Sequence, residues 1–283
     1  MKRIYTLCMM LCAFLAGFSQ IDSTAQKADT IKIGGMIIIK KPGEKGREIK
    51  REKDVSMPDR KRNKPTNVST NWWIVDLGLN NINDRTSYGS AAANAYMLPG
   101  AGGPFTKSDM NLRAGKSVNV NVWPFMQKLN LIKHAVNLKY GLGVELFNFR
   151  YKKNNNISYK EANPPYIFRD SVQFSKNKLA TDYLTVPLML NFNSTPHSGN
   201  TGFSLSVGVS AGYLYSNRNK QISNERGKEK EKGDIGLNRW KLAYVGELGL
   251  GPVRLYGTYA ITNLHESGLE QQPYAVGIRF SNW

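Results

Sequence analysis

The chain alternates between apolar and polar residues in eight stretches after residue 70. A period of two residues places successive side chains on opposite faces of a β-strand, so each stretch predicts a strand with one apolar face. The stretches span residues 72–80, 117–126, 135–151, 179–192, 202–215, 240–250, 253–262 and 273–280. Pro187 has no amide hydrogen for pairing, so we expect a bulge or locally broken pairing in the fourth stretch.

The connections between these stretches are alternately long and short. The long ones span 81–116, 152–178, 216–239 and 263–272, and the short ones span 127–133, 193–201 and 251–252. Bacterial membrane barrels have short periplasmic turns and longer external loops. The rhythm therefore predicts an all-β, eight-stranded antiparallel transmembrane up-and-down β-barrel with both termini in the periplasm. Parts of the second long connection, Tyr166 to Phe168 and Val172 to Phe174, are expected to extend strands beyond the membrane.

A soluble β-sandwich or a lipocalin-like barrel also alternates, but its apolar face points inward. Three features favour the membrane form: the asymmetric loop lengths, the many Gly, Ser and Asn residues on the polar face, and the aromatic residues near stretch ends. We expect the aromatic residues to form girdles at the two membrane interfaces. They are Trp72, Trp73, Trp123, Phe125, Phe192, Tyr213, Tyr215, Trp240 and Phe280.

Residues 1–25 have the layout of a secretory signal peptide. Lys2 and Arg3 precede a short apolar run, and small residues follow it, so cleavage is expected after Ala25 or after Ser19. Both cysteines, Cys8 and Cys12, lie in this segment. The mature chain therefore has no disulfide and no cysteine metal site.

Residues 26–70 form a basic tail before the barrel, which is assigned to 71–283. Lys27 to Lys64 holds 13 Lys or Arg and 6 Asp or Glu. Within the tail, residues 30–33 and 36–40 flank Gly34-Gly35 and predict a β-hairpin. A lone hairpin is marginal in water, so the tail is a possible contact for a periplasmic or outer-membrane protein partner.

The charge balance of the whole chain is +18, and it is +17 once residues 1–25 are removed. An exported basic chain meets lipid head groups and envelope glycans rather than nucleic acid. The expected partner is therefore outer-membrane lipid.

The polar face of the predicted barrel carries charges of both signs. An eight-stranded barrel is just wide enough for side chains to fill, and buried charges must be paired. We therefore expect an ion-pair network in a filled lumen rather than a solute channel. Its members are the acids Asp76, Glu145 and Glu247 and the bases Lys139, Lys241, Arg254 and Arg279.

One motif suggests catalysis: His265-Glu266-Ser267, with Glu270 close by, at the outer end of the seventh stretch. The pattern resembles the site of outer-membrane lipid A deacylases, in which His activates Ser, but Gly268 replaces the following Asn. A polar loop tip is the better interpretation.

No other residue pattern carries chemistry. His134 and His197 fall in predicted turns without metal-ligand spacing. The Gly-rich and Ala-rich stretch 90–103 lacks a phosphate-loop ending and is expected to be a flexible external loop. Residues 225–232 predict a solvated, mixed-charge loop tip. No catalytic, cofactor-binding or metal-binding residue is assigned, and no cofactor is expected.

Several segments give the chain a family resemblance. They are 115–121 (GKSVNVN), 140–145 (YGLGVE), 177–179 (NKL), 183–190 (YLTVPLML), 256–259 (YGTY) and 262–264 (TNL), with the closing strand. Through them, residues 71–283 resemble the PorT-like outer-membrane β-barrel proteins of Bacteroidetes-type bacteria. The resemblance implies an eight-stranded barrel. The namesake is linked to protein secretion, but the tail at 26–70 has no counterpart, so that role is not carried over.

Three classes of function follow. The leading one is a non-enzymatic integral outer-membrane barrel with a structural or interaction role and a filled lumen. The second is an accessory component of an outer-membrane protein export machine, docked through residues 26–70. The third is a rim lipid hydrolase, which is the least favoured.

Overall fold

The computed structural model describes two short strands at residues 30–33 and 36–39, and then residues 66–100, 103–153, 155–195, 202–251 and 253–281. The expected signal peptide, most of the tail, His197 and Trp283 lie outside these residues. The chain divides into two units, Met1–Arg62 and Asn63–Trp283. In the first unit, β1 (Thr30–Ile33) pairs antiparallel with β2 (Met36–Ile39). This pairing confirms the predicted hairpin.

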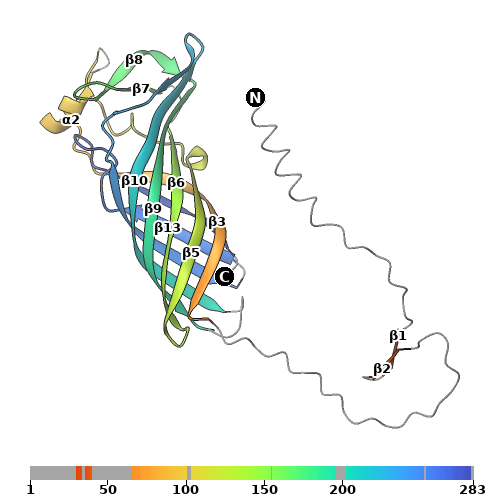
Figure 1. Ribbon diagram of the computed structural model, residues 1–283. Coiled ribbons are helices and arrows are strands. Elements are labelled where there is room, and N and C mark those ends of the chain that lie inside the picture. The colour runs from red at the N-terminus through yellow and green to blue at the C-terminus, as the bar shows by residue number, and fades with distance from the viewer. Residues whose placement is uncertain are drawn as a thin grey trace, which may run out of the picture. The chain divides into compact units, whose positions relative to one another are not determined.

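The second unit is built on eight long antiparallel strands that close into a ring (Figure 1). In ring order they are β3 (Val68–Asp84), β5 (Val118–Ile132), β6 (Val136–Arg150), β9 (Lys176–Asn193), β10 (Phe203–Ser223), β12 (Trp240–Leu250), β13 (Val253–Ala260) and β14 (Gln271–Phe280). Each strand pairs with the next along the chain, and β14 pairs with β3 to close the ring. The predicted up-and-down topology is confirmed, and all eight alternating stretches are barrel strands.

The connections alternate in length around the ring, as predicted. Three short turns follow β5, β9 and β12 at one end, which we call the turn end. The longer connections gather at the other end, which we call the loop end. They contain α2 (Ala91–Tyr96), β4 (Met97–Leu98), the short helix η1 (Ala114–Lys116), β7 (Asn155–Lys160), β8 (Tyr166–Phe174) and β11 (Gly227–Glu231).

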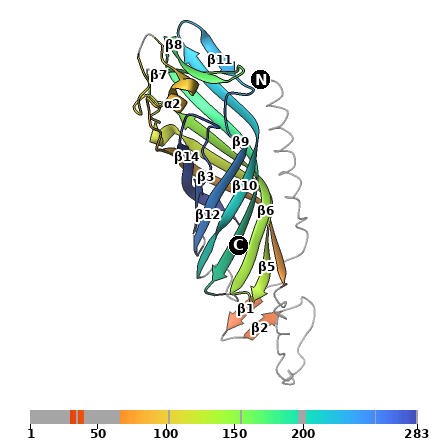
Figure 2. The same cartoon turned by 90° about the vertical axis from the view of Figure 1, so that its left-hand side faces the viewer.

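Three of these connections have secondary structure of their own (Figure 2). Strands β4, β8 and β7 form a separate three-stranded sheet, whereas Tyr166 to Phe168 and Val172 to Phe174, which both lie in β8, were expected to extend strands beyond the membrane. Strand β11 pairs with the loop-end part of β10 and lengthens the barrel wall there. No helix among the described residues is long and apolar enough to cross a membrane.

Burial along the strands decides between the membrane barrel and the soluble alternatives. On the part of β9 from residue 184 to residue 192, the outward side chains are all large and apolar and 42–51% exposed: Leu184, Val186, Leu188, Leu190 and Phe192. The polar side chains that alternate with apolar ones on β5 and β6, such as Asn121 and Lys139, are buried inside the ring. A continuous apolar exterior is unfavourable in water. Apolar side chains outside and polar side chains inside are therefore the pattern of a barrel surrounded by lipid. The soluble sandwich and lipocalin-like alternatives are excluded.

Pro187 interrupts pairing without a bulge. The register between β6 and β9 runs from Tyr140 opposite Leu188 to Gly143 opposite Thr185, and the two positions between them are unpaired. The expectation of broken pairing at this proline is confirmed. Bulges occur elsewhere, at Leu214/Ser216 in β10 and between Val122 and Phe125 in β5.

The bulge in β5 corrects the expected aromatic girdles. Trp123 precedes Pro124 at the register shift and points into the barrel, where it is 2% exposed. On the neighbouring strand β3, Trp73 has a positive φ of 58°, so Trp72 and Trp73 both point outward. Trp123 therefore belongs to the lumen. The other expected girdle residues lie on the outer wall.

Candidate functional site

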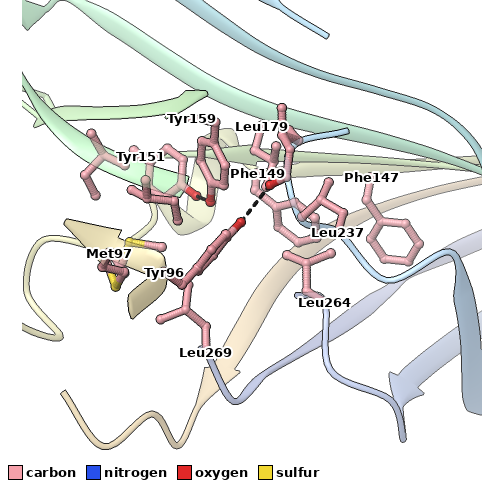
Figure 3. Packing of buried hydrophobic residues seen from close by; sticks show 14 of the residues in the cluster. Tyr96, Met97, Phe147, Phe149, Tyr151, Tyr159, Leu179, Leu237, Leu264 and Leu269 are labelled. Carbon is pink, nitrogen blue, oxygen red and sulfur yellow. Dashed lines mark hydrogen bonds between the residues drawn. The ribbon is translucent and has the colours of Figure 1, made fainter. Parts of the chain in front are cut away.

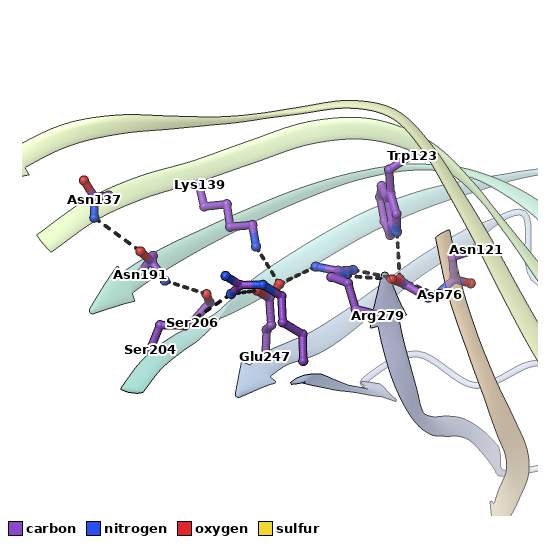
Figure 4. A network of polar contacts seen from close by, with 11 residues as sticks. Asp76, Asn121, Trp123, Asn137, Lys139, Asn191, Ser204, Ser206, Glu247 and Arg279 are labelled. Carbon is purple, nitrogen blue, oxygen red and sulfur yellow. Dashed lines mark hydrogen bonds and ion pairs between the residues drawn. The ribbon is translucent and has the colours of Figure 1, made fainter. Parts of the chain in front are cut away.

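The turn-end half of the lumen is filled by a network of charged side chains centred on Glu247 of β12 (Figure 4). Its carboxylate accepts hydrogen bonds from Lys139 Nζ at 2.5 Å and Arg279 Nη1 at 2.6 Å, and a longer one from Arg254 Nη1 at 3.4 Å. These cations come from β6, β14 and β13. Since β6 and β12 are not neighbours in the ring, the bond from Lys139 crosses the lumen.

Arg279 joins Glu247 to a second carboxylate, that of Asp76 on β3. Arg279 donates to Asp76 through Nε and Nη2, both at 2.7 Å, in a side-on bidentate pair. Trp123 Nε1 also donates to Asp76 at 2.7 Å, and Asn121 Nδ2 at 3.1 Å. Asp76 is completely buried. Its lone pairs are therefore satisfied by hydrogen bonds, as a buried carboxylate requires.

A third acid, Glu145 of β6, pairs with Lys241 of β12 and also accepts from Thr185 Oγ1 at 2.9 Å. The Lys241 ammonium lies 4.4 Å from the centre of the Phe147 ring, where cation–π attraction adds to the pairing. The ion-pair network predicted from the sequence is thus confirmed for all seven residues. With three acids and four bases, it nearly neutralises itself, and it offers no open carboxylate to act as acid or base.

The loop-end half of the lumen is filled by a core of aromatic and aliphatic side chains (Figure 3). The long connections fold inward and pack their apolar side chains against the inward-facing side chains at the loop ends of β6 and β9. We call this assembly the cap. Its buried members include Tyr96, Met97, Phe147, Phe149, Tyr151, Ile157, Tyr159, Ile167, Leu179, Ile235, Leu237, Leu264 and Leu269. Phe147 and Phe149 stack with ring centres 5.8 Å apart.

Hydrogen bonds order the tyrosines of the cap. Tyr96 OH donates to the carbonyl oxygen of Ile235 at 2.7 Å, which joins α2 to the β10–β12 connection. Tyr151 OH and Tyr159 OH are 2.6 Å apart and share a hydrogen bond. Burial raises the pKa of Tyr159 well above its ordinary value. These hydroxyls therefore stay protonated and serve as fixed donors inside the cap.

Two glycines allow the connections to close around Tyr96. Gly236 and Gly268 each have a φ of 77°, which side-chain-bearing residues rarely adopt. A Cβ on Gly236 would lie 2.7 Å from the Tyr96 ring, and one on Gly268 would lie 2.7 Å from Tyr96 Cβ and 2.9 Å from the Ala92 carbonyl oxygen. Both connections can pack this closely because neither carries a side chain at the contact.

His265, the histidine of the candidate hydrolase motif, is a member of this cap. It is 1% exposed, stacks on Tyr159 with ring centres 5.9 Å apart, and its Nε2 lies 3.3 Å from Tyr159 OH. Desolvation lowers its pKa to about 3, so it is neutral at physiological pH. Ser267, Glu266 and Glu270 are exposed. The structure thus buries the imidazole against a tyrosine and leaves the three polar residues on the surface, so the motif is not assembled as a His–Ser pair.

The remaining sequence candidates fall in turns and loops. His134 follows Lys133 in the β5–β6 turn, and both have a positive φ, at 58° and 45°. The stretch 90–103 was expected to be a flexible loop. Instead Ser90 caps α2 by accepting a hydrogen bond from the Ala93 amide at 3.2 Å, and β4 follows. In the described part of the chain, no group of three or more His, Cys, Asp or Glu residues could hold a metal ion.

Sequence reasoning missed the cap because its members are scattered over four connections. A usable signal was present, since these connections contain apolar residues that a solvated loop has no reason to carry, such as Tyr96, Met97, Ile157, Ile235 and Leu237. Period-two alternation does not extend to these residues. Their partners are set by the way the connections fold over the mouth of the barrel.

Comparison with known proteins places the chain among membrane barrels. Two solved structures of Ail, the attachment invasion locus protein of Yersinia pestis, align with 75% of this chain and 98% of theirs, at a TM-score of 0.30 and 13% and 10% sequence identity. In one of them, Ail is in complex with the heparin analogue sucrose octasulfate. No curated protein matches the sequence. Residues 75–266 match the model of the outer membrane protein beta-barrel domain, and the chain belongs to that family.

Proposed function

We propose that this protein is a closed, non-enzymatic barrel of the outer membrane with a structural or interaction role. The observation that carries the proposal is that both halves of the lumen are filled. The turn-end half holds the ion-pair network around Glu247, and the loop-end half holds the cap. A barrel of this size has no room for a solute path past such side chains. What remains for function is the outer surface of the loop end and the tail.

Planar lipid bilayers test the closed lumen directly. Purified full-length protein is expected to give no stable ion conductance, whereas a porin inserted under the same conditions gives the positive signal. Stable large channels from this protein would overturn the proposal. The catalytic alternative is tested by His265→Ala, which should leave the acylation of outer-membrane glycolipid unchanged.

The loop end is proposed to face the cell exterior, with both termini in the periplasm. The rhythm of short turns and long connections supports this orientation, because bacterial barrels place their short turns in the periplasm. No cysteine lies beyond residue 25, so single cysteine substitutions in the barrel can be labelled without competing thiols once the proposed signal peptide is removed. Ser267→Cys at the loop end should react with a membrane-impermeant maleimide on whole cells. Ser194→Cys at the turn end should react only after the outer membrane is permeabilised.

The tail supports a second candidate, an accessory role in export to the cell surface. The hairpin of β1 and β2 has only two strands, and an isolated two-stranded hairpin is marginal in water. A protein partner that binds residues 26–70 would stabilise it. The chain is further proposed to be a PorT-like barrel of Bacteroidetes-type bacteria from which residues 1–25 are removed on export. Because the tail has no counterpart in that family, the export candidate rests on the hairpin and not on the resemblance.

Deleting residues 26–65 separates the two candidates while leaving β3 intact, since that strand begins at Val68. An export role through the tail predicts that cargo proteins accumulate in the periplasm of cells that express the shortened chain. A role confined to the loop end predicts no accumulation. The level of folded barrel in the outer membrane is the control for both outcomes.

A further inference from the structure

The outer ends of four neighbouring strands carry a row of cations. Arg150 of β6 is opposite Lys178 of β9, Lys178 is opposite Lys220 of β10, and Lys220 is opposite Lys230 of β11. Directly opposed residues point to the same face of a sheet. The register thus places four positive side chains side by side across the outer wall at the loop end, where β10 and β11 project farthest in Figure 2.

A second row lies two residues further along each of the strands β9, β10 and β11, toward the tip of the loop end. Ile222 of β10 is opposite Lys176 of β9 on one side and Lys228 of β11 on the other. Because strand side chains alternate with a period of two, this row shares its face with the first. We call the two rows together the cation ladder; its members are Arg150, Lys176, Lys178, Lys220, Lys228 and Lys230.

Acids on the same face do not neutralise the ladder. The outward positions of β6, β9, β10 and β11 near it include one acid, Asp182, which pairs with Arg218 at 2.7 Å. Glu229 and Glu231 of β11 alternate with the lysines and point to the opposite face, where Glu231 pairs with Lys160 at 3.0 Å. Among the described residues, no member of the ladder forms an ion pair.

The cations repel one another where they stand. Coulombic repulsion by Lys228 lowers the pKa of Lys230, and desolvation, Lys232 and Lys220 add to the effect. Like charges directly opposite on neighbouring strands destabilise a sheet. A row of this kind therefore weakens the folded loop end unless anions lie against it.

The ladder stands just beyond the apolar belt of the barrel. On β10, Tyr215 is 54% exposed and marks the loop-end boundary, next to the Tyr213 and Trp240 rings. Lys220 lies five residues further along the strand. At about 3.3 Å per residue and a tilt of about 40°, this is roughly 12 Å above the aromatic residues. Lysine side chains reach downward from there to the level of lipid headgroups.

We propose that the cation ladder binds the phosphate groups of lipid headgroups in the leaflet that the loop end enters. Charge complementarity and height above the apolar belt both favour this occupant. Ladder cations spaced about 4.8 Å from strand to strand can contact several phosphates of one headgroup or of adjacent headgroups. This inference specifies the ligand of the proposed interaction role. It can fail separately from the closed lumen, which the conductance assay tests.

Retention of lipid on immobilised full-length protein tests the proposal. The probe is a diphosphorylated glucosamine lipid in neutral detergent, and its dephosphorylated form is the reference. The variant K178A/K220A/K230A removes three ladder cations. The matched control K116A/K152A/K153A removes three exposed lysines outside the ladder. Both must keep the heat-dependent electrophoretic shift of a folded barrel.

Each lysine near an anionic surface contributes on the order of fivefold to binding, so the ladder variant should lose at least roughly tenfold in affinity at low salt while the control stays within roughly twofold. Equal losses in both variants, or equal retention of the dephosphorylated lipid, would overturn the proposal. Displacement of the lipid by equimolar pyrophosphate would assign the ladder to free phosphate instead. Tighter retention of a sulfated polysaccharide than of the phosphorylated lipid would also contradict it.

Discussion

Lys139 and Glu247 span the lumen: the ammonium on β6 donates to the carboxylate on β12 at 2.5 Å, although the two strands are not neighbours in the ring. The bond ties opposite walls together. It is supported on the acid's side by Arg279 and Arg254. The two partners are therefore unequal, since Glu247 pairs with three cations and keeps two of them when Lys139 is removed.

This inequality predicts asymmetric effects of substitution. Glu247→Gln leaves three buried cations short of one negative charge and should lower the free energy of unfolding by about 3–5 kcal/mol. Lys139→Met removes one buried charge while Glu247 keeps two partners, and should cost less than about 2 kcal/mol. The urea concentration at which the folded electrophoretic form disappears measures both. Similar midpoints for the two variants would contradict the prediction.

Closure of the cap around Tyr96 predicts a specific glycine effect. Gly268→Ala introduces both a positive-φ strain of about 1 kcal/mol and a clash with α2 that costs about 1–3 kcal/mol more. Gly89 has a similar φ of 87° but open space around its Cβ position. Gly89→Ala is thus the matched control and carries the strain alone. Limited proteolysis of the long connections should be faster in Gly268→Ala than in Gly89→Ala.

The buried His265 predicts that acid opens the cap. Its pKa in the folded state is about 3, below the ordinary 6.5, so only the opened cap takes up the proton between these values. Its contribution is fully favourable above pH 6.5 and is lost as the pH falls toward 3. Between pH 7 and pH 5 the free energy of cap opening should fall by about 2 kcal/mol.

Near-UV circular dichroism of the cap tyrosines can follow this change. His265→Phe keeps an aromatic ring against Tyr159 but cannot be protonated, so its spectrum should stay constant from pH 7 to pH 5. Asp84, whose pKa burial raises but hydrogen bonds from Tyr88, Thr86 and Gln271 lower below its ordinary value overall, titrates beneath this range. The same pH response in the wild type and in His265→Phe would refute the assignment.

Tryptophan fluorescence tests the two environments on the barrel wall. Trp240 is 61% exposed on the outside, whereas Trp123 is 2% exposed and donates to Asp76 inside. In variants that retain one tryptophan, brominated lipid should quench Trp240 strongly and Trp123 weakly. Strong quenching of Trp123 would place its ring outside the lumen and contradict the position described above.

The barrel itself could be predicted from the sequence, because the position of each strand and the direction of its side chains follow from residues that are close together in the chain. Alternation along each strand fixes which residues face inward, so Asp76, Glu145 and Glu247 could be assigned to the lumen together with their cations. Pairing then followed from neutrality, because those acids and bases share one narrow space. The long and short connections gave the strand order without any knowledge of contacts.

The cap and the cation ladder depend on information that alternation does not contain. Tyr96 meets Ile235 and His265 across more than 130 residues of sequence, and nothing local marks those partners. Trp123 was misplaced because Pro124 shifts the register by a bulge. The ladder became visible only when the pairing of β6, β9, β10 and β11 set its lysines side by side.

The pairing of β14 with β3 brings together the first and last strands of the ring, and Arg279 meets Asp76 across that joint. During synthesis Asp76 is made some two hundred residues before its guanidinium partner. A chain cut short before β14 would hold an uncompensated carboxylate and an open strand edge on each side of the gap. Closure of the wall and neutralisation of its most deeply buried acid therefore both depend on the last strand of the barrel to be made.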